Sequence, residues 1–259
     1  IVISQSGETM DTIAATELLK ENGAHVLALV NVVGSSLARM ADSVFYLHVG
    51  PEIGVASTKA YLGMLVGQLL LAKHWDSANK LDVSFDEIAE LPKLIEQTMA
   101  CEKQIKDISE KIYKKNDIYF IGRGLDYALA AEGALKLKEI SYLHAEALAA
   151  GELKHGTLAL IEDGTPIIVT ASQNHLLDKT TSNVQEVIAR GAYVIAIGDN
   201  QSEKLENISD EYVTLPDSNE FLTTVISIIP LQFIAYHVAN LNGESIDQPR
   251  NLAKSVTVE

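Results

Sequence analysis

The sequence predicts an α/β fold of two doubly wound, three-layer lobes with parallel sheets, the first lobe being truncated at its N-terminus. Two observations lead to this prediction. Short runs of β-branched residues alternate with longer stretches of helical spacing, which is typical of parallel strands joined by crossover helices. The chain also repeats itself, because residues 23–29 (GAHVLAL) recur as residues 191–197 (GAYVIAI) at an offset of 168. We therefore expect two copies of one α/β unit.

The expected elements follow in chain order. A strand at the start of the chain leads into a helix that ends near Glu21, with Gly23 just past its end as a C-cap. The first copy is completed by strands at 23–29 and 44–47 and a helix at 58–74. Residues 86–114 carry apolar side chains at helical spacing and indicate connecting helices. The second copy is expected to contain strands at 118–121, 191–197 and 212–215, with helices through 132–139 and over 226–242.

The repeat also gives the expected domain boundaries. At the same offset Ser4 maps onto Ser172 and Asp42 onto Asp210. The counterpart of the strand at 118–121 would precede residue 1, so the first lobe is expected to lack roughly fifty residues. We expect a first lobe at 1–80, connecting helices at 81–110, a second lobe at 111–246 and a C-terminal tail at 247–259.

Composition and charge exclude several classes of protein. With 47% hydrophobic residues the chain has the composition of a folded globular protein, and its net charge of −15 argues against nucleic acid or an anionic membrane as a partner. The single cysteine, Cys101, excludes a disulfide scaffold and suits a reducing compartment. The apolar stretches at 62–72 and 225–239 are too short or too interrupted to cross a membrane and indicate buried helices. We expect a cytoplasmic protein.

Motifs for metals and dinucleotides are incomplete. Gly122 and Gly124 follow a strand and open a helix, but Tyr127 stands where a dinucleotide fingerprint has its third glycine. His144 and Glu146 match half of a zinc deaminase signature, and the cysteine pair that such a site needs is missing. We therefore expect no metal and no cofactor.

The first motif with chemical content is a loop of hydroxyl groups at residues 4–9 (SQSGET). It lies between a strand and a helix, where backbone N–H groups and the helix dipole favour an anion. Ser4, Ser6 and Thr9 add hydroxyl donors, and Gly7 allows close approach of the backbone. The same residue types are favoured at an ordinary helix N-cap, so composition alone leaves both interpretations open.

The second motif is a set of ionisable groups in the second copy. Glu132, Lys136 and Glu139 are spaced i, i+4 and i+7 and share one face of the expected helix. A solvated ion pair explains this spacing as well as a catalytic cluster does. His155, between Lys154 and a glycine, is either a loop histidine that reaches a ligand or a surface histidine.

Four segments together resemble one enzyme family. They are residues 4–9, residues 52–59 (EIGVASTK), residues 132–156 and the tail DQPRNLAKSVTVE at 247–259. The chain resembles, over essentially all of its length, the isomerase region of the glutamine–fructose-6-phosphate aminotransferases, which is built of two sugar isomerase (SIS) domains. That family makes glucosamine 6-phosphate from fructose 6-phosphate, with ammonia from an N-terminal glutaminase domain that this sequence does not contain. The resemblance further implies a homodimer.

The resemblance assigns roles to individual residues. It implies that Glu139 is the base that moves a proton between C1 and C2, with Lys136 beside it. The apolar residues Leu135 and Ile140 that flank Glu139 are compatible with the desolvation that raises the pKa of a carboxylate. Lys254 would engage the open-chain ketose carbonyl. His155 would assist ring opening from the neighbouring subunit. The sugar phosphate would be held by Ser4, Gln5, Ser6 and Thr9, and the sugar contacted by Val55, Ser57 and Ala253.

Two other functions fit parts of the pattern. A regulatory SIS module that binds a phosphosugar without converting it needs the loop at 4–9, but it needs neither the carboxylate base nor the C-terminal lysine. Another SIS isomerase or deglycase would lack the ending at 247–259. The tail therefore favours the aminotransferase.

Overall fold

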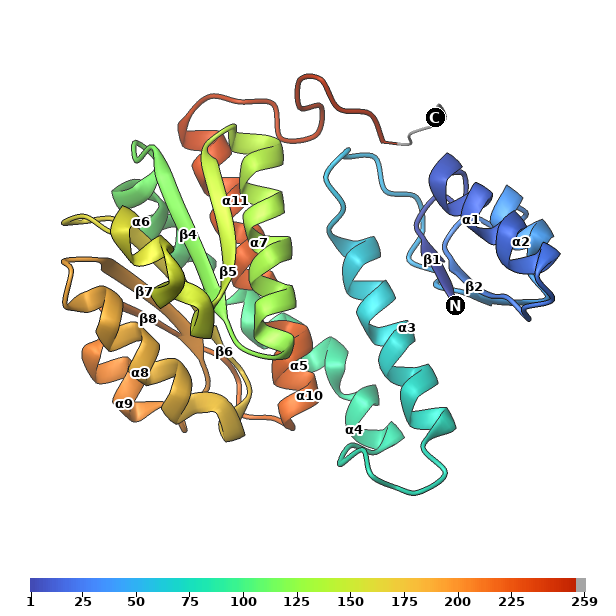
Figure 1. Cartoon of the computed structure of the whole chain (residues 1–259), viewed down its shortest axis with the longest axis horizontal. Helices are drawn as coiled ribbons and strands as arrows, with labels where there is room; N and C mark the ends of the chain where they lie inside the picture. The colour runs from blue at the N-terminus through green and yellow to red at the C-terminus, as the bar shows by residue number, and fades with distance from the viewer. Residues whose placement is uncertain (255–259) are drawn as a thin grey trace. The chain divides into compact units, whose positions relative to one another are not determined.

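The computed structural model describes residues 1–254 and divides the chain into two compact units (Figure 1). Unit 1 comprises Ile1–Leu81 together with the tail that begins at Asp247, and unit 2 comprises Asp82–Ile246. The tail thus belongs to the same unit as the N-terminal residues. The segment predicted to hold connecting helices belongs to unit 2.

Unit 1 is a small parallel sheet covered by helices. Its strands β1 (Val2–Ser4), β2 (Leu27–Val30) and β3 (Ser43–Tyr46) pair in the order β1-β2-β3. Its helices are α1 (Met10–Glu21), α2 (Ser36–Met40) and α3 (Lys59–Trp75).

Alternation along β2 separates the two faces of this sheet. Ala28 and Val30 belong to a cluster with Leu37 of α2, and Ile13 of α1 packs against that cluster. Leu29 points to the other face, where its side chain lies against Gly67 of α3. Successive residues of a strand point to opposite faces, so the short β2 serves both layers of helices.

Unit 2 has a five-stranded parallel sheet in the order β5-β4-β6-β7-β8. The strands are β4 (Asp117–Gly122), β5 (His144–Ala149), β6 (Pro166–Ala171), β7 (Tyr193–Gly198) and β8 (Glu211–Thr214). The chain leaves β4 for β5 on one side and then places β6 on the other side. The carboxyl ends of β4 and β6 therefore form a topological switch point, where open α/β sheets usually bind ligands.

Helices cover both faces of this sheet, as Figure 1 shows for α8 and α9 on one side and α7 and α11 on the other. Val184 and Leu205 pack α8 and α9 onto the face that carries Ile167 and Val194. On the opposite face, Gly133 of α7 lies against Phe120 of β4. The elements are α4 (Phe85–Ala89), α5 (Leu91–Met99), α6 (Glu102–Ile112), α7 (Leu125–Ser141), η1 (Ala150–His155), η2 (Thr157–Leu160), η3 (Asn174–Leu176), α8 (Leu177–Ile188), α9 (Glu203–Ile208), α10 (Glu220–Ile226) and α11 (Ile228–Leu241). The predicted α/β fold with parallel sheets is confirmed.

The sequence repeat is present in the hydrogen bonds as well as in the order of elements. Strands β6-β7-β8 repeat β1-β2-β3. In unit 1 the Val26 N–H donates to Asp42 Oδ2 at 2.8 Å, and in unit 2 the Val194 N–H donates to Asp210 Oδ2 at 2.8 Å. Both residues of each pair are related by the offset of 168, so the repeated aspartates hold the starts of equivalent strands.

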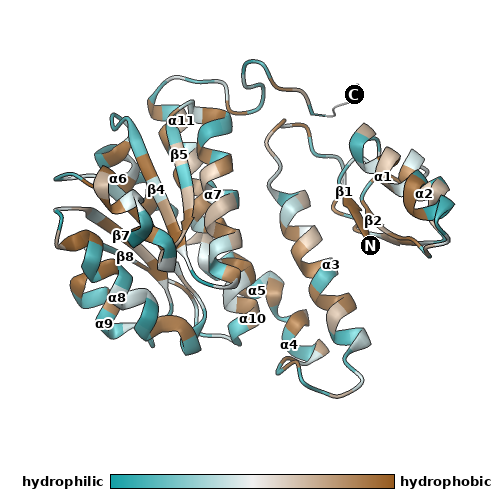
Figure 2. Ribbon diagram, in the orientation of Figure 1, coloured by the Kyte–Doolittle hydropathy of each residue, from teal (hydrophilic) through white to brown (hydrophobic). Residues whose placement is uncertain are grey.

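One run in the described residues, Glu220–Leu241, is long and apolar enough to cross a membrane by composition. In unit 2 it forms α10 and α11, and 78% of its most apolar window is buried inside the structure. A core helix passes the same test, and α11 packs against α7 and α6. Figure 2 shows comparable hydrophobic colour on strands β1, β2 and β4, which are core elements too.

Candidate active site

The loop at residues 4–9 joins β1 to α1 and is folded around its own hydroxyl groups. The Gly7 N–H donates to Ser4 Oγ at 3.0 Å, and the Glu8 N–H donates to Ser6 Oγ at 3.2 Å. Thr9 is the N-cap of α1, but its side chain makes no capping hydrogen bond to the helix. The first-turn N–H groups of a helix have no partner within it, so this end of α1 is suited to an anion.

Gly7 and Glu8 anchor this loop to α2. Gly7 has φ +67°, and a Cβ there would overlap the buried Ser35 side chain, so glycine is required. The Leu37 N–H donates to the Gly7 carbonyl at 3.0 Å, and the Ser36 N–H donates to Glu8 Oε1 at 2.8 Å. This backbone hydrogen bond from Ser36 lowers the pKa of Glu8. The loop is thereby held in one conformation.

A second loop of unit 1, before α3, converges on the Glu52 carboxylate. Ser57 Oγ donates to Glu52 Oε2 at 2.8 Å, and the N–H groups of Thr58 and Ala60 donate to Oε1 at 2.8 and 3.3 Å. Only 6% of the Glu52 side chain is exposed. Sequence reasoning did not assign Glu52 a role. The one available signal was an acidic residue shortly before the expected start of a helix.

The C-terminal tail packs on this same loop. The Val55 N–H donates to the Asp247 carbonyl at 2.9 Å, where the tail begins. At the other end of the described tail, Lys254 Nζ lies 2.5 Å from Glu52 Oε2. Ala253 is exposed beside it. The structure therefore brings together Lys254, Val55 and Ser57, three of the residues predicted for the site. Residues 255–259 of the predicted tail lie outside the described part of the chain.

In unit 2 the three charged residues of α7 form one ion-paired cluster. Lys136 Nζ lies 2.6 Å from Glu139 Oε2 and 3.4 Å from Glu132 Oε1. The lysine side chain is 5% exposed, Glu132 is 12% exposed and Glu139 is 21% exposed. Because its lysine is buried, this cluster differs from the solvated surface ion pair that was the alternative interpretation of the spacing.

The environment of this cluster is less apolar than the one expected from sequence. Leu135 is 40% exposed, whereas Ile140 is buried four residues after Lys136, on the same side of α7. Burial raises the pKa of Glu132, while the nearby Lys136 opposes that increase. The partner that defines the surroundings of Glu139 is the Lys136 ammonium.

The two histidines singled out from sequence lie at different places in unit 2. His155 ends η1 and is exposed. His144 begins β5, and its Nδ1 lies 2.7 Å from Asp117 Oδ1 at the amino ends of β4 and β5. Among residues 1–254, no group of three or more His, Cys, Asp or Glu side chains is arranged to hold a metal.

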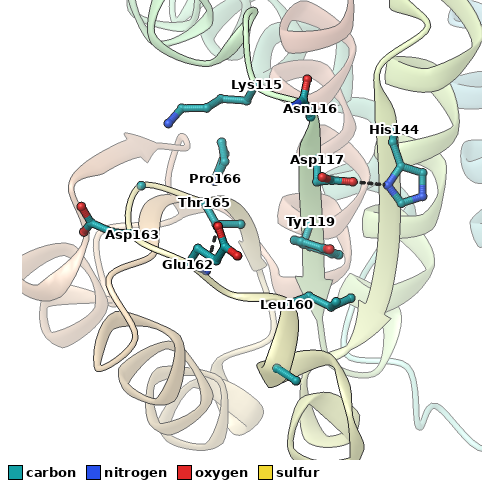
Figure 3. A pocket seen from close by; sticks show the side chains of 12 residues that line it. Lys115, Asn116, Asp117, Tyr119, His144, Leu160, Glu162, Asp163, Thr165 and Pro166 are labelled. Atoms are coloured by element: carbon teal, nitrogen blue, oxygen red, sulfur yellow. Dashed lines mark hydrogen bonds and ion pairs between the residues drawn. The ribbon is translucent and has the colours of Figure 1, made fainter.

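A hollow of about 470 Å³ opens beside His144 (Figure 3). It lies at the amino ends of the unit 2 strands, whereas ligands of parallel α/β sheets bind at the carboxyl ends. Of the residues singled out from sequence it is lined by His144 alone, and by none of those to which the resemblance assigns a role. Its walls are formed by Lys115, Asn116, Asp117, Tyr119, His144, Ala159, Leu160, Glu162, Asp163, Gly164, Thr165 and Pro166.

The candidate residues thus form two groups, each described within its own unit. Unit 1 holds the hydroxyl loop at 4–9 and the Lys254–Glu52 pair on the loop before α3. Unit 2 holds the α7 cluster and His155. One group offers hydroxyls, a helix N-terminus and an amine, and the other offers carboxylates paired with a lysine.

Comparison with known proteins agrees with this division. The SIS domain family matches residues 1–73 and 111–241. A glutamine–fructose-6-phosphate aminotransferase (isomerizing) from Thermococcus kodakarensis is 48% identical over 265 residues, which cover 100% of this chain and 44% of that protein. The protein of the same name from Pyrococcus horikoshii is 49% identical over 261 residues, covering 100% of this chain and 43% of that protein. The chain therefore spans less than half the length of these curated relatives.

A solved structure extends the agreement to three dimensions. The C-terminal domain of glucosamine-fructose-6-phosphate aminotransferase from Francisella tularensis superposes with a TM-score of 0.87 at 41% identity, covering 95% of this chain and 71% of that one. The resemblance inferred from the four sequence segments is confirmed. This chain belongs to the SIS domain family and, within it, to the family of the C-terminal domain of glucosamine-fructose-6-phosphate aminotransferases.

Proposed function

We propose that this chain is the isomerase half of a glutamine-dependent aminotransferase, which converts fructose 6-phosphate into glucosamine 6-phosphate with ammonia from an N-terminal glutaminase domain. One observation carries the proposal. In a chain whose relatives bear this enzyme's name, an amine and a carboxylate–lysine cluster, the groups that this chemistry needs, are both held in ion pairs. The sugar phosphate is the substrate, and no cofactor takes part.

The α7 cluster supplies the acid–base chemistry. Interconversion of a ketose and an aldose moves one proton between C1 and C2, which requires a carboxylate that can take and return it. Glu139 is the more exposed carboxylate of the cluster and takes this role, while Lys136 stabilises the negative charge that develops on the sugar oxygen. Glu132 holds the other side of the Lys136 ammonium.

Unit 1 supplies binding and the amine. Ser4, Gln5, Ser6 and Thr9 hold the phosphate at the N-terminus of α1 without any net positive charge, since hydroxyl and N–H donors suffice for an anion there. Phosphate binding far from C1 orients the reacting carbons. Lys254 forms a protonated imine with the open-chain ketose carbonyl, and Val55, Ser57 and Ala253 contact the sugar.

A regulatory module that binds a phosphosugar is the alternative of a different class. The loop at 4–9 would serve it equally well. It has no use for a buried lysine between two carboxylates on α7, nor for an amine that the tail holds against Glu52. These two features favour an enzyme.

The Glu139→Gln variant tests the proposal. With fructose 6-phosphate and ammonium ions, we expect product formation to fall about 100-fold or more, because the amide cannot act as a base. The dissociation constant for fructose 6-phosphate, measured by calorimetry, should stay within about threefold, since no phosphate contact is removed. Glu110→Gln, an exposed residue at the end of α6, is the matched control. Binding without turnover by the unaltered chain would instead support the regulatory module.

The homodimer is part of the proposal, because ring opening by His155 is assigned to the neighbouring subunit. Mixing inactive Glu139→Gln and His155→Ala chains tests it. Half of randomly paired dimers are mixed, and each mixed dimer has one intact site, so about a quarter of the activity should return. No recovery, together with a monomeric mass by light scattering, would contradict the shared site.

We also propose a cytoplasmic location. The sequence has one cysteine, Cys101, which is free, and this composition suits a reducing compartment.

A further inference from the structure

The Glu52 carboxylate is the meeting point of three segments of unit 1. It accepts hydrogen bonds from the N–H groups of Thr58 and Ala60 at the start of α3, from the Ser57 hydroxyl, and from Lys254 of the tail. Its two oxygens accept from different donors. Oε1 caps the helix, while Oε2 is shared by Ser57 at 2.8 Å and Lys254 at 2.5 Å. One oxygen is therefore structural, and the other faces the amine.

The loop that carries Glu52 is also the docking site of the tail. Gly54 has no side chain at the point where Asp247 crosses, and a Cβ there would lie 3.1 Å from Asp247 Oδ1. The Val55 N–H fixes the Asp247 carbonyl. The tail is thus attached to this loop at its beginning by Asp247 and again at Lys254, so the position of the amine is determined by the loop.

An ammonium group cannot attack a carbonyl, because its nitrogen has no free electron pair. Lys254 must therefore lose a proton before it forms an imine, and the carboxylate oxygen 2.5 Å away is the group placed to receive it. Burial of Glu52 works against its charged form, but hydrogen bonds from Lys254, Thr58 and Ser57 outweigh burial and lower its pKa. In the resting protein the pair is accordingly an ammonium and a carboxylate.

We propose that Glu52 is a catalytic residue that holds the Lys254 amine against the substrate carbonyl and carries one proton from this amine to the oxygen that leaves as water. This inference rests on the proposed function and adds a group to it. The Lys254 ammonium first gives a proton to Glu52. The freed electron pair of Nζ then forms a bond to the carbonyl carbon, and a proton moves from nitrogen to the former carbonyl oxygen.

The second half of the step returns the proton. Glu52 gives it back to the hydroxyl group of the adduct, the C–O bond breaks, and water leaves. The products are the protonated imine on Lys254, one water molecule and the Glu52 carboxylate. No oxidant, reductant or other reactant is needed, and the pair ends with the charge it had at the start.

Glu52→Gln separates this role from that of a helix cap. The amide oxygen can still accept from the N–H groups at the start of α3, whereas a neutral amide cannot take the proton of Lys254. With fructose 6-phosphate and borohydride, the imine is reduced to a stable adduct on Lys254 that intact-mass measurement quantifies. We expect the adduct to form about 100-fold more slowly in this variant, the loss typical of a missing base. The melting temperature and the fructose 6-phosphate dissociation constant should change little.

Two controls make the result decisive. Glu21→Gln on the exposed end of α1 should form the adduct at the rate of the unaltered chain. Ser57→Ala removes one donor but keeps the Glu52 carboxylate, so its adduct rate should fall far less than that of Glu52→Gln. Equal adduct rates in Glu52→Gln and the unaltered chain would overturn the inference and leave the proposed function standing. Absence of any adduct on the unaltered chain would overturn both.

Discussion

Ser4 of unit 1 and Ser172 of unit 2 occupy equivalent places at the carboxyl ends of equivalent strands, β1 and β6, but they use their polar groups differently. Ser4 Oγ accepts from the Gly7 N–H within its own loop and lies 3.4 Å from Thr9 Oγ1. Ser172 is fully buried, and both its N–H and its hydroxyl donate to the carboxylate of Asp126, the hydroxyl at 2.5 Å. The same dipeptide, Ser-Gln, begins both loops.

The glutamines of the two dipeptides, Gln5 and Gln173, differ in the same way. Gln5 is only partly buried at the start of the hydroxyl loop. Gln173 is 8% exposed, and its Oε1 accepts from the Leu125 N–H at the start of α7. At the switch point of unit 2, a carboxylate and an amide of the chain itself thus occupy the donors that a bound anion would use. The two loops thus keep the same place after their strands, but the hydrogen-bond donors of the unit 2 loop bind groups of the chain, whereas those of the unit 1 loop can bind a ligand.

Removing Asp126 is the strongest test of this difference. In Asp126→Ala the buried Ser172 N–H loses its acceptor, while the Ser172 hydroxyl keeps Thr224 Oγ1 2.8 Å away, and we expect a loss of about 3 kcal/mol, the upper end for an unsatisfied buried group. Urea unfolding should show this loss, whereas Asp107→Ala on the exposed face of α6 should stay within about 0.5 kcal/mol of the unaltered chain. A loss below 1 kcal/mol would mean that the carboxylate does not hold the loop.

The glycine of the unit 1 loop gives the next largest effect. Its counterpart in unit 2 is His175, which lies in η3 and is exposed, so only unit 1 requires a positive φ here. Gly7→Ala adds a steric conflict with Ser35 to the cost of that φ, and we expect a total of about 3 kcal/mol.

Gly23→Ala is the matched control, because Gly23 has φ +79° and nothing within 4 Å of the new Cβ. It should cost about 1 kcal/mol, the price of the backbone conformation alone. Similar unfolding free energies for the two variants would show that the contact with Ser35 is not tight. The measurement is again urea unfolding.

Much of the fold could be predicted because the repeat and the β-branched runs are local signals. The strand expected at 212–215 is β8 (Glu211–Thr214), and the helix expected at 58–74 is α3 (Lys59–Trp75). The strand expected at 23–29 begins only at Leu27, because its neighbour β1 is three residues long and pairs from Val2 to Ser4. Strand β5, with sequence HAEALA, was not predicted, since these residues have low β-propensity.

The candidate site was less accessible to sequence reasoning, for a physical reason. The spacing of Glu132, Lys136 and Glu139 placed them on one helix face, and there they form one cluster. Glu52 could not be found in this way, because its contact with Lys254 spans 202 residues and depends on how the tail folds back. The hydrogen bonds between Asp126, in the first turn of α7, and Ser172, just after β6, have the same character, because these residues are 46 apart in the sequence.

Substitution of the two serines should affect ligand binding differently, and this effect is smaller than the losses of stability predicted above. Under the proposed function, Ser4→Ala should weaken fructose 6-phosphate binding about tenfold, the value of one hydrogen bond to a charged group, and lower the unfolding free energy by about 1 kcal/mol, because the Gly7 N–H loses its acceptor. Ser172→Ala should lower only the unfolding free energy and leave the dissociation constant unchanged, because its donors already serve Asp126. Calorimetric titration of both variants checks this. Equal weakening by the two substitutions would remove the distinction between the loops.

The smallest effect is a pH dependence that only unit 2 should show. Burial raises the pKa of Asp126, although the hydrogen bonds from Ser172 oppose it. A carboxyl group with a raised pKa in the folded state contributes stability that is fully present below its unfolded pKa and is lost as the pH rises through the folded one. Asp126→Asn removes this titration and keeps an acceptor for Ser172.

The stability of the unaltered chain relative to Asp126→Asn should therefore decrease as the pH rises from about 4 to 8, by at most about 1.4 kcal/mol per pH unit, the limit for one proton. Carboxylates with lowered pKa values, such as Asp42, Asp76 and Glu52, are common to both proteins and cancel in the difference. Thermal unfolding of the two proteins across this range measures it. A stability difference that is constant or increases with pH would mean that burial does not disfavour the charged form of Asp126.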